Sequence, residues 1–232
     1  MSNGPVFNFE GEYARAYEGI IRLVCPGYDN LYRMEEGLLH TLLGEQAHVL
    51  IAGAGGGMEV QTFAPANPNW RFTGVDPSTV MIESAQAKVT ANGLDERVQL
   101  LRGFVHDLPA EAQFDGATCN LVLHFLQVEE KLGLLQSIYD RLKPGAAFVC
   151  SSMFGELGKE DFNLNIGALY RMALQSGFPQ EKLDAMKGSL NGEMVLLPEE
   201  QTADLLRQVG FEKVSRFHTG LSISGWVARK PQ

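Results

Sequence analysis

The stretch His48–Gly57, HVLIAGAGGG, decides the fold. Its first half is an uninterrupted apolar run, which predicts a buried strand of a parallel sheet over 48–53. The glycines that follow allow a sharp turn into a helix and a close approach of ligand to backbone. A second strand is predicted over 70–75, and Asp76 stands at its tip. An acid about twenty residues after such glycines accepts hydrogen bonds from ribose hydroxyls, so the pair predicts a site for a nucleoside-bearing cofactor.

The glycine spacing narrows the kind of cofactor. A dinucleotide fingerprint requires Gly-x-Gly-x-x-Gly, but the last place of that pattern is Met58 here. The glycines instead follow the pattern Gly53-x-Gly55-x-Gly57, and no Gly-Lys-Ser/Thr is present to hold a triphosphate. Phosphate recognition is therefore not indicated, and a nicotinamide dehydrogenase is disfavoured.

Composition limits the other function classes. The chain has 232 residues, of which 45% are hydrophobic, enough for one α/β domain with a modest insertion. A net charge of −9 argues against a broad nucleic-acid surface and favours small-molecule or carrier-borne partners. The three cysteines are scattered, which predicts buried thiols and no metal site. No signal peptide or membrane-spanning run is evident, so we expect a cytoplasmic protein without a membrane partner; the oligomeric state stays open, a homodimer included.

Strand and helix patterns alternate along the chain, which predicts a parallel sheet. Further strands are expected at 98–102, 114–121 and 146–152, and a β-hairpin at 211–218 and 221–229. We divide the chain into N-terminal lid helices (1–44), an α/β core that binds the cofactor (45–152), a helical insertion that holds the acceptor (153–195), and a C-terminal helix and hairpin that complete the sheet (196–232).

Several motifs together resemble the class I S-adenosylmethionine-dependent methyltransferases. They are the glycine spacing, Asn120 with the residues that follow it, and the turn Leu142-Lys143-Pro144-Gly145. The stretch 25–30, CPGYDN, is most similar to the branch of carboxy-S-adenosylmethionine synthase and related small-molecule methyltransferases. The resemblance implies a Rossmann-like, seven-stranded sheet, mostly parallel, whose last strand is antiparallel.

The resemblance also implies S-adenosylmethionine as cofactor and S-adenosylhomocysteine as product. Matching this chain to the family's motifs gives a set of expected cofactor-binding residues. They are Tyr17, Tyr28, Gly53, Ala54, Gly55, Asp76, Pro77, Met81, Phe104, Val105 and Asn120.

Three positions depart from the family pattern. Ile51 replaces an acid that orients the glycine loop or the methionine amino group, and Phe104 replaces an acid that binds the adenine amino group. A more apolar cofactor pocket, closed by the N-terminal helices, is the expected result. Leu205 stands where the synthase has an arginine for the extra carboxylate of its cofactor, so ordinary S-adenosylmethionine is favoured, because a buried carboxylate without a partner is costly.

Methyl transfer needs few catalytic side chains, because the sulfonium is already activated and the protein chiefly aligns the reactants. Where the acceptor must lose a proton, His124 and His106 are the candidate bases. The sequence leaves the accepting atom open, since this fold serves many acceptors. Two alternatives to methyl transfer to a small organic acceptor remain: a synthase-like enzyme that modifies the sulfonium, and a non-catalytic module that binds the cofactor.

Overall fold

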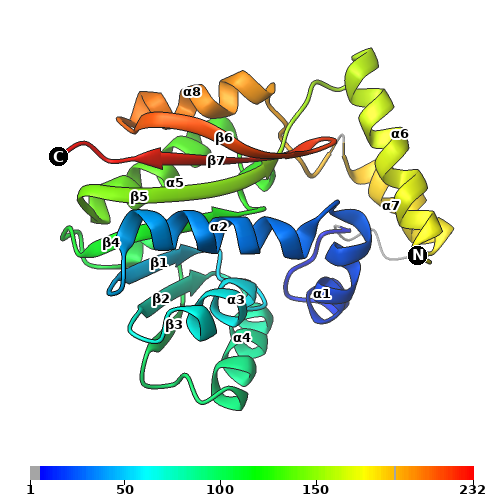
Figure 1. Ribbon diagram of the computed structural model, residues 1–232. Coiled ribbons are helices and arrows are strands. Elements are labelled where there is room, and N and C mark those ends of the chain that lie inside the picture. Colours follow the sequence, from blue (N-terminus) through cyan, green and yellow to red (C-terminus); the bar gives the residue numbers. More distant parts are fainter. Residues whose placement is uncertain (1–5, 191) are drawn as a thin grey trace.

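The computed structural model describes residues 6–190 and 192–232. Its centre is a seven-stranded sheet with the strand order β3-β2-β1-β4-β5-β7-β6 (Figure 1). β1 to β5 are parallel, whereas β7 is antiparallel to both of its neighbours, β5 and β6. The expected Rossmann-like sheet with an antiparallel last strand is thereby confirmed.

The strands follow the apolar runs of the sequence closely. Their bounds are β1 His48–Ala52, β2 Arg71–Asp76, β3 Val98–Arg102, β4 Phe114–Asn120, β5 Leu142–Met153, β6 Glu212–Gly220 and β7 Ile223–Arg229. The helices are α1 Glu12–Val24, α2 Tyr28–Leu43, α3 Met58–Ala66, α4 Thr79–Ala91, α5 Val128–Arg141, α6 Glu160–Gln175, α7 Gln180–Ser189 and α8 Glu199–Val209.

Helices cover both faces of the sheet, because successive side chains of a strand point to opposite faces. Val49 and Ile51 of β1 pack in a core cluster with residues of α2, α3 and α4. Leu50 and Ala52 pack in a second cluster, with residues of α5 and α8. Burial on both faces explains why the first strand reads as a continuous apolar run.

The start of one strand differs by several residues from the one expected. β5 begins at Leu142 rather than at 146, because Leu142 already pairs with Phe114 of β4. The residues between Leu142 and Ala147 form an irregularity in that pairing rather than a loop before the strand.

The third glycine of the motif is required by packing. Gly57 has a φ of +80° at the start of α3, and a Cβ there would lie 3.2 Å from the Cα of Ala85 on α4. A side chain at this position would push the two helices apart, since the contact is with backbone.

The helices outside the core differ in their positions. α1 contacts α6 of the insertion, and these two helices lie with α7 beyond one end of the sheet (Figure 1). α2, by contrast, packs across the sheet against β4 and β5. Residues 1–5 of the expected lid segment and residue 191 of the expected insertion lie outside the described residues.

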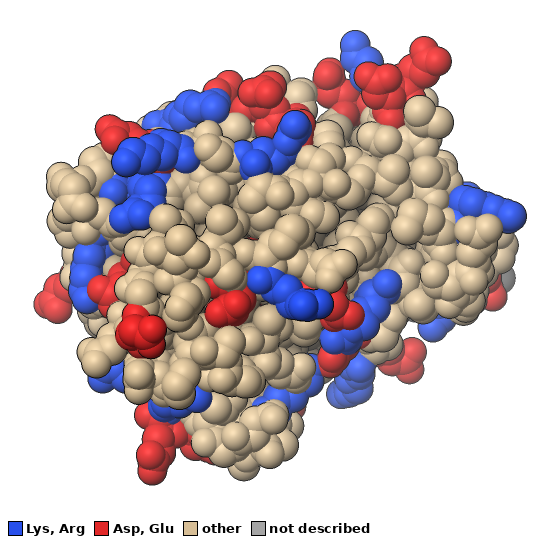
Figure 2. Space-filling view, in the orientation of Figure 1, with Lys and Arg blue, Asp and Glu red and all other residues tan. Residues whose placement is uncertain are grey.

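The surface carries charges of both signs. On the face in Figure 2, acidic and basic side chains are interspersed around a largely uncharged area. Over residues 6–190 and 192–232, no helix has both the length and the apolar character that crossing a membrane requires.

Candidate functional site

A cavity of about 790 Å³ lies where β1, β2 and β4 end, and we call it the cofactor cavity. The carboxyl ends of parallel strands are the usual ligand-binding edge of such sheets. Most of the predicted cofactor-binding residues line this cavity. They are Tyr17, Tyr28, Gly53, Ala54, Gly55, Asp76, Pro77, Met81 and Asn120.

Asp76 is held rigidly at the edge of the cofactor cavity. Its Oδ2 accepts a hydrogen bond of 2.9 Å from the backbone N–H of Gly55, and its Oδ1 accepts one of 2.9 Å from that of Ser78. Ser78, not Asp76, caps α4, because its hydroxyl accepts from the N–H of Met81. The Asp76 carboxylate therefore joins the glycine loop to the start of α4, and each oxygen keeps a second lone pair for a ligand.

The buried polar residues Glu35, Glu59 and Asn120, which we call the carboxyl–amide cluster, adjoin the cavity. The Asn120 Nδ2 donates to Oε2 of Glu35 at 2.6 Å and to Oε1 of Glu59 at 3.2 Å. Asn120 Oδ1 accepts from the Ser151 hydroxyl at 2.8 Å. One amide thus bridges two carboxyl groups, of which Glu59 lines the cofactor cavity.

Burial governs the protonation of this cluster. Desolvation, with the nearby Glu59 carboxyl, raises the pKa of Glu35 well above its ordinary value. Desolvation also raises the pKa of Glu59, to about 7, although hydrogen bonds from its own backbone and from Asn120 act in the opposite direction. Burial therefore favours the neutral form of the Glu35 carboxyl, whereas a pKa of about 7 lets the Glu59 carboxyl change its charge near neutral pH.

Sequence reasoning missed both glutamates of the cluster. Ile51, which stands in place of the family's acid, is fully buried in the core and supplies no polar group to the cavity. Glu59 supplies a carboxyl from the first turn of α3 instead. Two features of the sequence could have indicated these residues: Glu59 stands two residues after the glycine run, and Glu35 stands among the apolar residues of a helix that packs on the core.

We call residues 6–11 the N-terminal strap. This segment lies over the strand tips and is held there by hydrogen bonds at both ends. At one end, Glu193 accepts hydrogen bonds from the N–H groups of Val6 and Phe7, at 2.9 and 3.0 Å. At the other end, the Ser78 hydroxyl donates to the carbonyl of Phe9, whose ring stacks edge-on with that of Phe125. Since Phe9 lines the cofactor cavity, the strap forms part of its wall.

The remaining predicted cofactor residues lie in an adjoining cavity. Phe104, Val105 and His106 line a cavity of about 1090 Å³ that shares Gly53 and Pro77 with the cofactor cavity. The ring of Phe104 is 53% exposed and stacks on that of His106, with 5.2 Å between their centroids. His106 thus lines this adjoining cavity and not the cofactor cavity, which Glu59 and Asn120 line.

His124 lies in a different cavity. This apolar cavity, of about 620 Å³, is bounded by α1, the insertion and the tips of β4 and β5, and it shares Tyr17, Leu121 and Phe125 with the cofactor cavity. The His124 Nδ1 accepts from the backbone N–H of Met153 at 3.1 Å. Burial, with the charge of Lys131, lowers the pKa of His124 to about 3, so the ring is neutral and its proton resides on Nε2.

Leu205 contributes to no cavity described above. It is buried on α8 in the core cluster that contains Leu206 and Phe211. Among the described residues, the three cavities are lined by no lysine or arginine. The part of the chain that the structure describes holds no cluster of His, Cys, Asp or Glu suited to a metal ion, and its cysteines Cys25, Cys119 and Cys150 are buried and free.

Comparison with known proteins agrees with this geometry. Residues 49–145 match the profile of a family described as a methyltransferase domain. Among curated proteins, the carboxy-S-adenosyl-L-methionine synthase of Erwinia tasmaniensis is 24% identical over 237 residues, which cover 99% of this chain and 94% of that protein.

Solved structures show the same fold. The magnesium protoporphyrin IX methyltransferase of Synechocystis, solved with S-adenosylhomocysteine, has a TM-score of 0.70 at 15% identity, with 96% of each chain covered. The Burkholderia thailandensis 1,6-didemethyltoxoflavin-N1-methyltransferase has a TM-score of 0.60 at 24% identity, with 95% of this chain and 90% of that chain covered. Some neighbours are longer: this chain spans 58% of the S-adenosylmethionine-dependent methyltransferase SibL.

Residues 49–145 match a methyltransferase domain, and the sheet order is that of the solved S-adenosylmethionine-dependent methyltransferases to which the chain is similar. These findings make the protein a methyltransferase-type enzyme with S-adenosylmethionine as its cofactor.

Proposed function

We propose that the protein transfers the methyl group of S-adenosylmethionine to a small organic acceptor. The observation that carries this proposal is the junction of two cavities at the strand tips: most of the predicted cofactor-binding residues line one, and the other adjoins it. The cofactor supplies an activated methyl group: a lone pair of the acceptor attacks its carbon, and the carbon–sulfur bond breaks with its electron pair left on sulfur.

The residues of the cofactor cavity fit this molecule. Asp76 accepts hydrogen bonds from the ribose hydroxyls, and Gly53 and Gly55 leave room for the backbone to approach it. Phe104 and Val105 border the adenine together with Pro77. Tyr17 and Tyr28 present aromatic rings, which attract a cationic sulfonium. The N-terminal strap excludes water, which keeps the reactants aligned.

Binding of the two cofactor forms and mass analysis test the proposal together. We expect S-adenosylmethionine and S-adenosylhomocysteine both to bind in calorimetry with micromolar dissociation constants. With a donor whose methyl group is isotopically labelled, a cell extract should yield a small molecule that carries the label. Failure of both cofactor forms to bind the folded protein contradicts the proposal.

The Glu59 carboxyl takes the place of the missing acid at 51 and faces the ammonium group of the cofactor's methionine part. An ammonium favours the charged carboxylate, so it lowers the pKa of Glu59 from about 7. Binding of S-adenosylhomocysteine at about pH 6 should then release about one proton, and affinity should rise between about pH 6 and 8. Calorimetry in buffers of different ionisation enthalpy measures this release.

Two variants identify the group that releases the proton. Glu59→Gln should abolish the release, while Glu45→Gln, in an exposed loop, should retain it. The other titratable groups around Glu59 are Glu35, Asp76, Tyr17, Tyr28, Tyr32 and Cys119. Proton release that persists in Glu59→Gln assigns the effect to one of these and contradicts the role of Glu59.

A second candidate function is modification of the sulfonium itself, which the curated relatives named carboxy-S-adenosyl-L-methionine synthase favour. A carboxylated cofactor needs a cationic partner for its extra carboxylate, and no lysine or arginine lines the three cavities among the described residues. Mass analysis of the sulfonium compounds after turnover separates the two functions: a carboxylated sulfonium supports the second.

A further inference from the structure

The apolar cavity beside the cofactor cavity has an unusual lining. None of its lining residues is Asp, Glu, Lys or Arg. Sulfur-bearing side chains, Met153 and Met186 among them, and aromatic rings dominate it. The aromatic members are Phe7, Tyr13, Tyr17, Phe125 and Tyr170. Such rings and thioethers offer flat, polarisable contacts that suit an aromatic guest.

Charge sets a strict condition on the occupant. A carboxylate or phosphate in this cavity would lose its hydration without gaining a counter-charge, which is unfavourable. Two cations lie near the cavity without lining it: Lys187, which is 4.7 Å from the centre of the Tyr170 ring and pairs with Asp184, and Lys131, whose charge acts on His124. The cavity therefore selects for an uncharged molecule.

Two of the polar side-chain groups in this lining can bond a ligand. The Tyr170 hydroxyl is buried and has no hydrogen-bond partner among the described residues, an arrangement that is rare unless a ligand or water completes it. His124 offers the second, because its Nδ1 is occupied by the Met153 N–H and its Nε2 keeps the proton. A ring oxygen or nitrogen of the occupant can accept from Nε2–H, and a hydroxyl can pair with Tyr170.

The cavity is also closed from several sides. The Val195 N–H donates to the carbonyl of His124 at 2.9 Å, and Lys131 donates to the carbonyl of Val195 at 2.8 Å. These bonds fix the end of the insertion against the loop after β4.

We propose that this cavity is the acceptor site and that it takes an uncharged aromatic or heteroaromatic compound, hydrogen-bonded to His124 and Tyr170. The inference rests on the proposed function, since the shared residues Tyr17, Leu121 and Phe125 place the occupant next to the cofactor. His124 acts as a hydrogen-bond donor to the acceptor rather than as a base at Nδ1.

Probes matched in shape test the inference in the full-length protein saturated with S-adenosylhomocysteine. β-Naphthol represents the class, β-naphthoate adds a charge, and decalol removes the aromatic character. Calorimetry should give binding of β-naphthol, with β-naphthoate and decalol at least about tenfold weaker. Equal or tighter binding of β-naphthoate overturns the uncharged class, and equal binding of decalol overturns the aromatic class.

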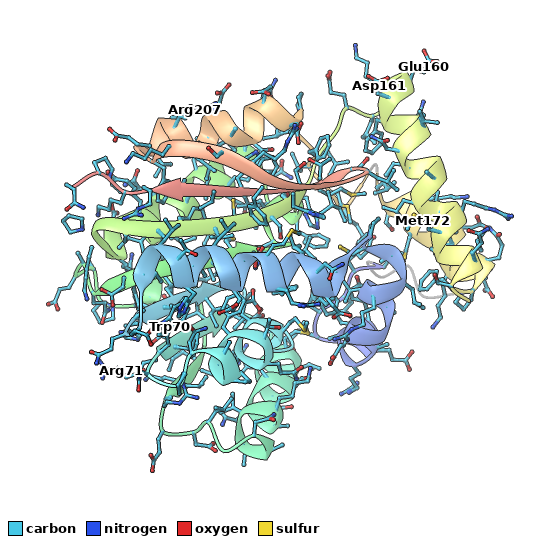
Figure 3. All side chains as sticks on the ribbon, in the orientation of Figure 1. Trp70, Arg71, Glu160, Asp161, Met172 and Arg207 are labelled. Atoms are coloured by element: carbon cyan, nitrogen blue, oxygen red, sulfur yellow. The ribbon has the colours of Figure 1, made fainter. Side chains whose placement is uncertain are left out.

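Variants then locate the bound probe. Met186→Trp places a larger side chain in the cavity. It should lower the affinity for β-naphthol at least about tenfold, because a filled cavity has no space for two rings. Met172→Trp is the matched control: Met172 is 45% exposed on α6 and labelled in Figure 3, and it should leave binding unchanged. Tyr170→Phe should lower the affinity for β-naphthol roughly fivefold, because it removes one hydrogen bond. Tyr139→Phe, which lies outside the cavity, should leave this affinity unchanged.

Cofactor affinity keeps the two proposals distinguishable. Every variant is also titrated with S-adenosylhomocysteine, whose dissociation constant should stay within about twofold of wild type, since the changed residues do not line the cofactor cavity. Absence of cofactor binding in the wild-type protein contradicts the proposed function. Normal cofactor binding, with β-naphthol unaffected by Met186→Trp, contradicts only the acceptor site.

Discussion

An Asp76→Asn variant is expected to bind S-adenosylhomocysteine on the order of 100-fold more weakly than the wild-type protein, as calorimetry would measure. Two effects add. The ribose loses a charged acceptor, and the new amide can satisfy only one of the two backbone N–H groups, of Gly55 and Ser78, that Asp76 binds. The variant therefore holds the glycine loop less rigidly, and it also offers the ribose a weaker hydrogen-bond acceptor.

Asp115→Asn is the control variant. It also replaces an acid near the end of a strand, but at a place remote from the predicted ribose site. Asp115 accepts from the His48 N–H at 2.8 Å and pairs with Lys143, at the opposite end of the sheet from the cofactor cavity. This variant should bind S-adenosylhomocysteine normally. An Asp76→Asn variant that keeps the wild-type affinity would show that the ribose lies elsewhere.

The second large effect concerns stability. Asn120→Leu should lower the free energy of unfolding by about 3 kcal/mol or more, because three buried polar groups lose a partner and each such loss costs about 1–3 kcal/mol. These groups are on Glu35, Glu59 and Ser151. Urea unfolding followed by circular dichroism measures the change, and Asn163→Leu on the exposed side of α6 should change little.

The pH dependence of this loss identifies the cluster as its cause. The pKa of Glu59 is raised in the folded protein, to about 7, so the folded state holds a proton that the unfolded state has already released above about pH 4.5. Stability therefore falls as pH rises between these values, and Asn120→Leu, which removes a hydrogen bond that lowers this pKa, should extend the fall to higher pH. Adding Glu35→Leu should restore part of the stability; a double variant no more stable than Asn120→Leu would contradict the coupling.

The sequence alone was sufficient for the sheet and the glycine loop because their signals are local. β1 is apolar on both faces, and Gly53, Gly55 and Gly57 precede an acid at the spacing of two adjacent strand tips. Parallel strands end at one edge, so this order of residues fixes their meeting point.

The carboxyl–amide cluster could not be predicted in the same way. Glu35 and Asn120 are 85 positions apart, and only the packing of α2 across β4 brings them together. An isolated glutamate on a helix is ordinarily exposed, so the pattern of residues gave no reason to bury this one. The insertion presented a similar difficulty, since its aromatic and methionine residues suit a plain core as well as a cavity.

The N-terminal strap links the wall of the cofactor cavity to the start of a helix. Phe9 lines the cavity, its carbonyl accepts from the Ser78 hydroxyl, and its ring lies against that of Phe125. The same Ser78 hydroxyl caps α4 by accepting from the Met81 N–H. A displacement of Phe9 that lengthens its bond to Ser78 therefore also acts on the helix that follows Asp76.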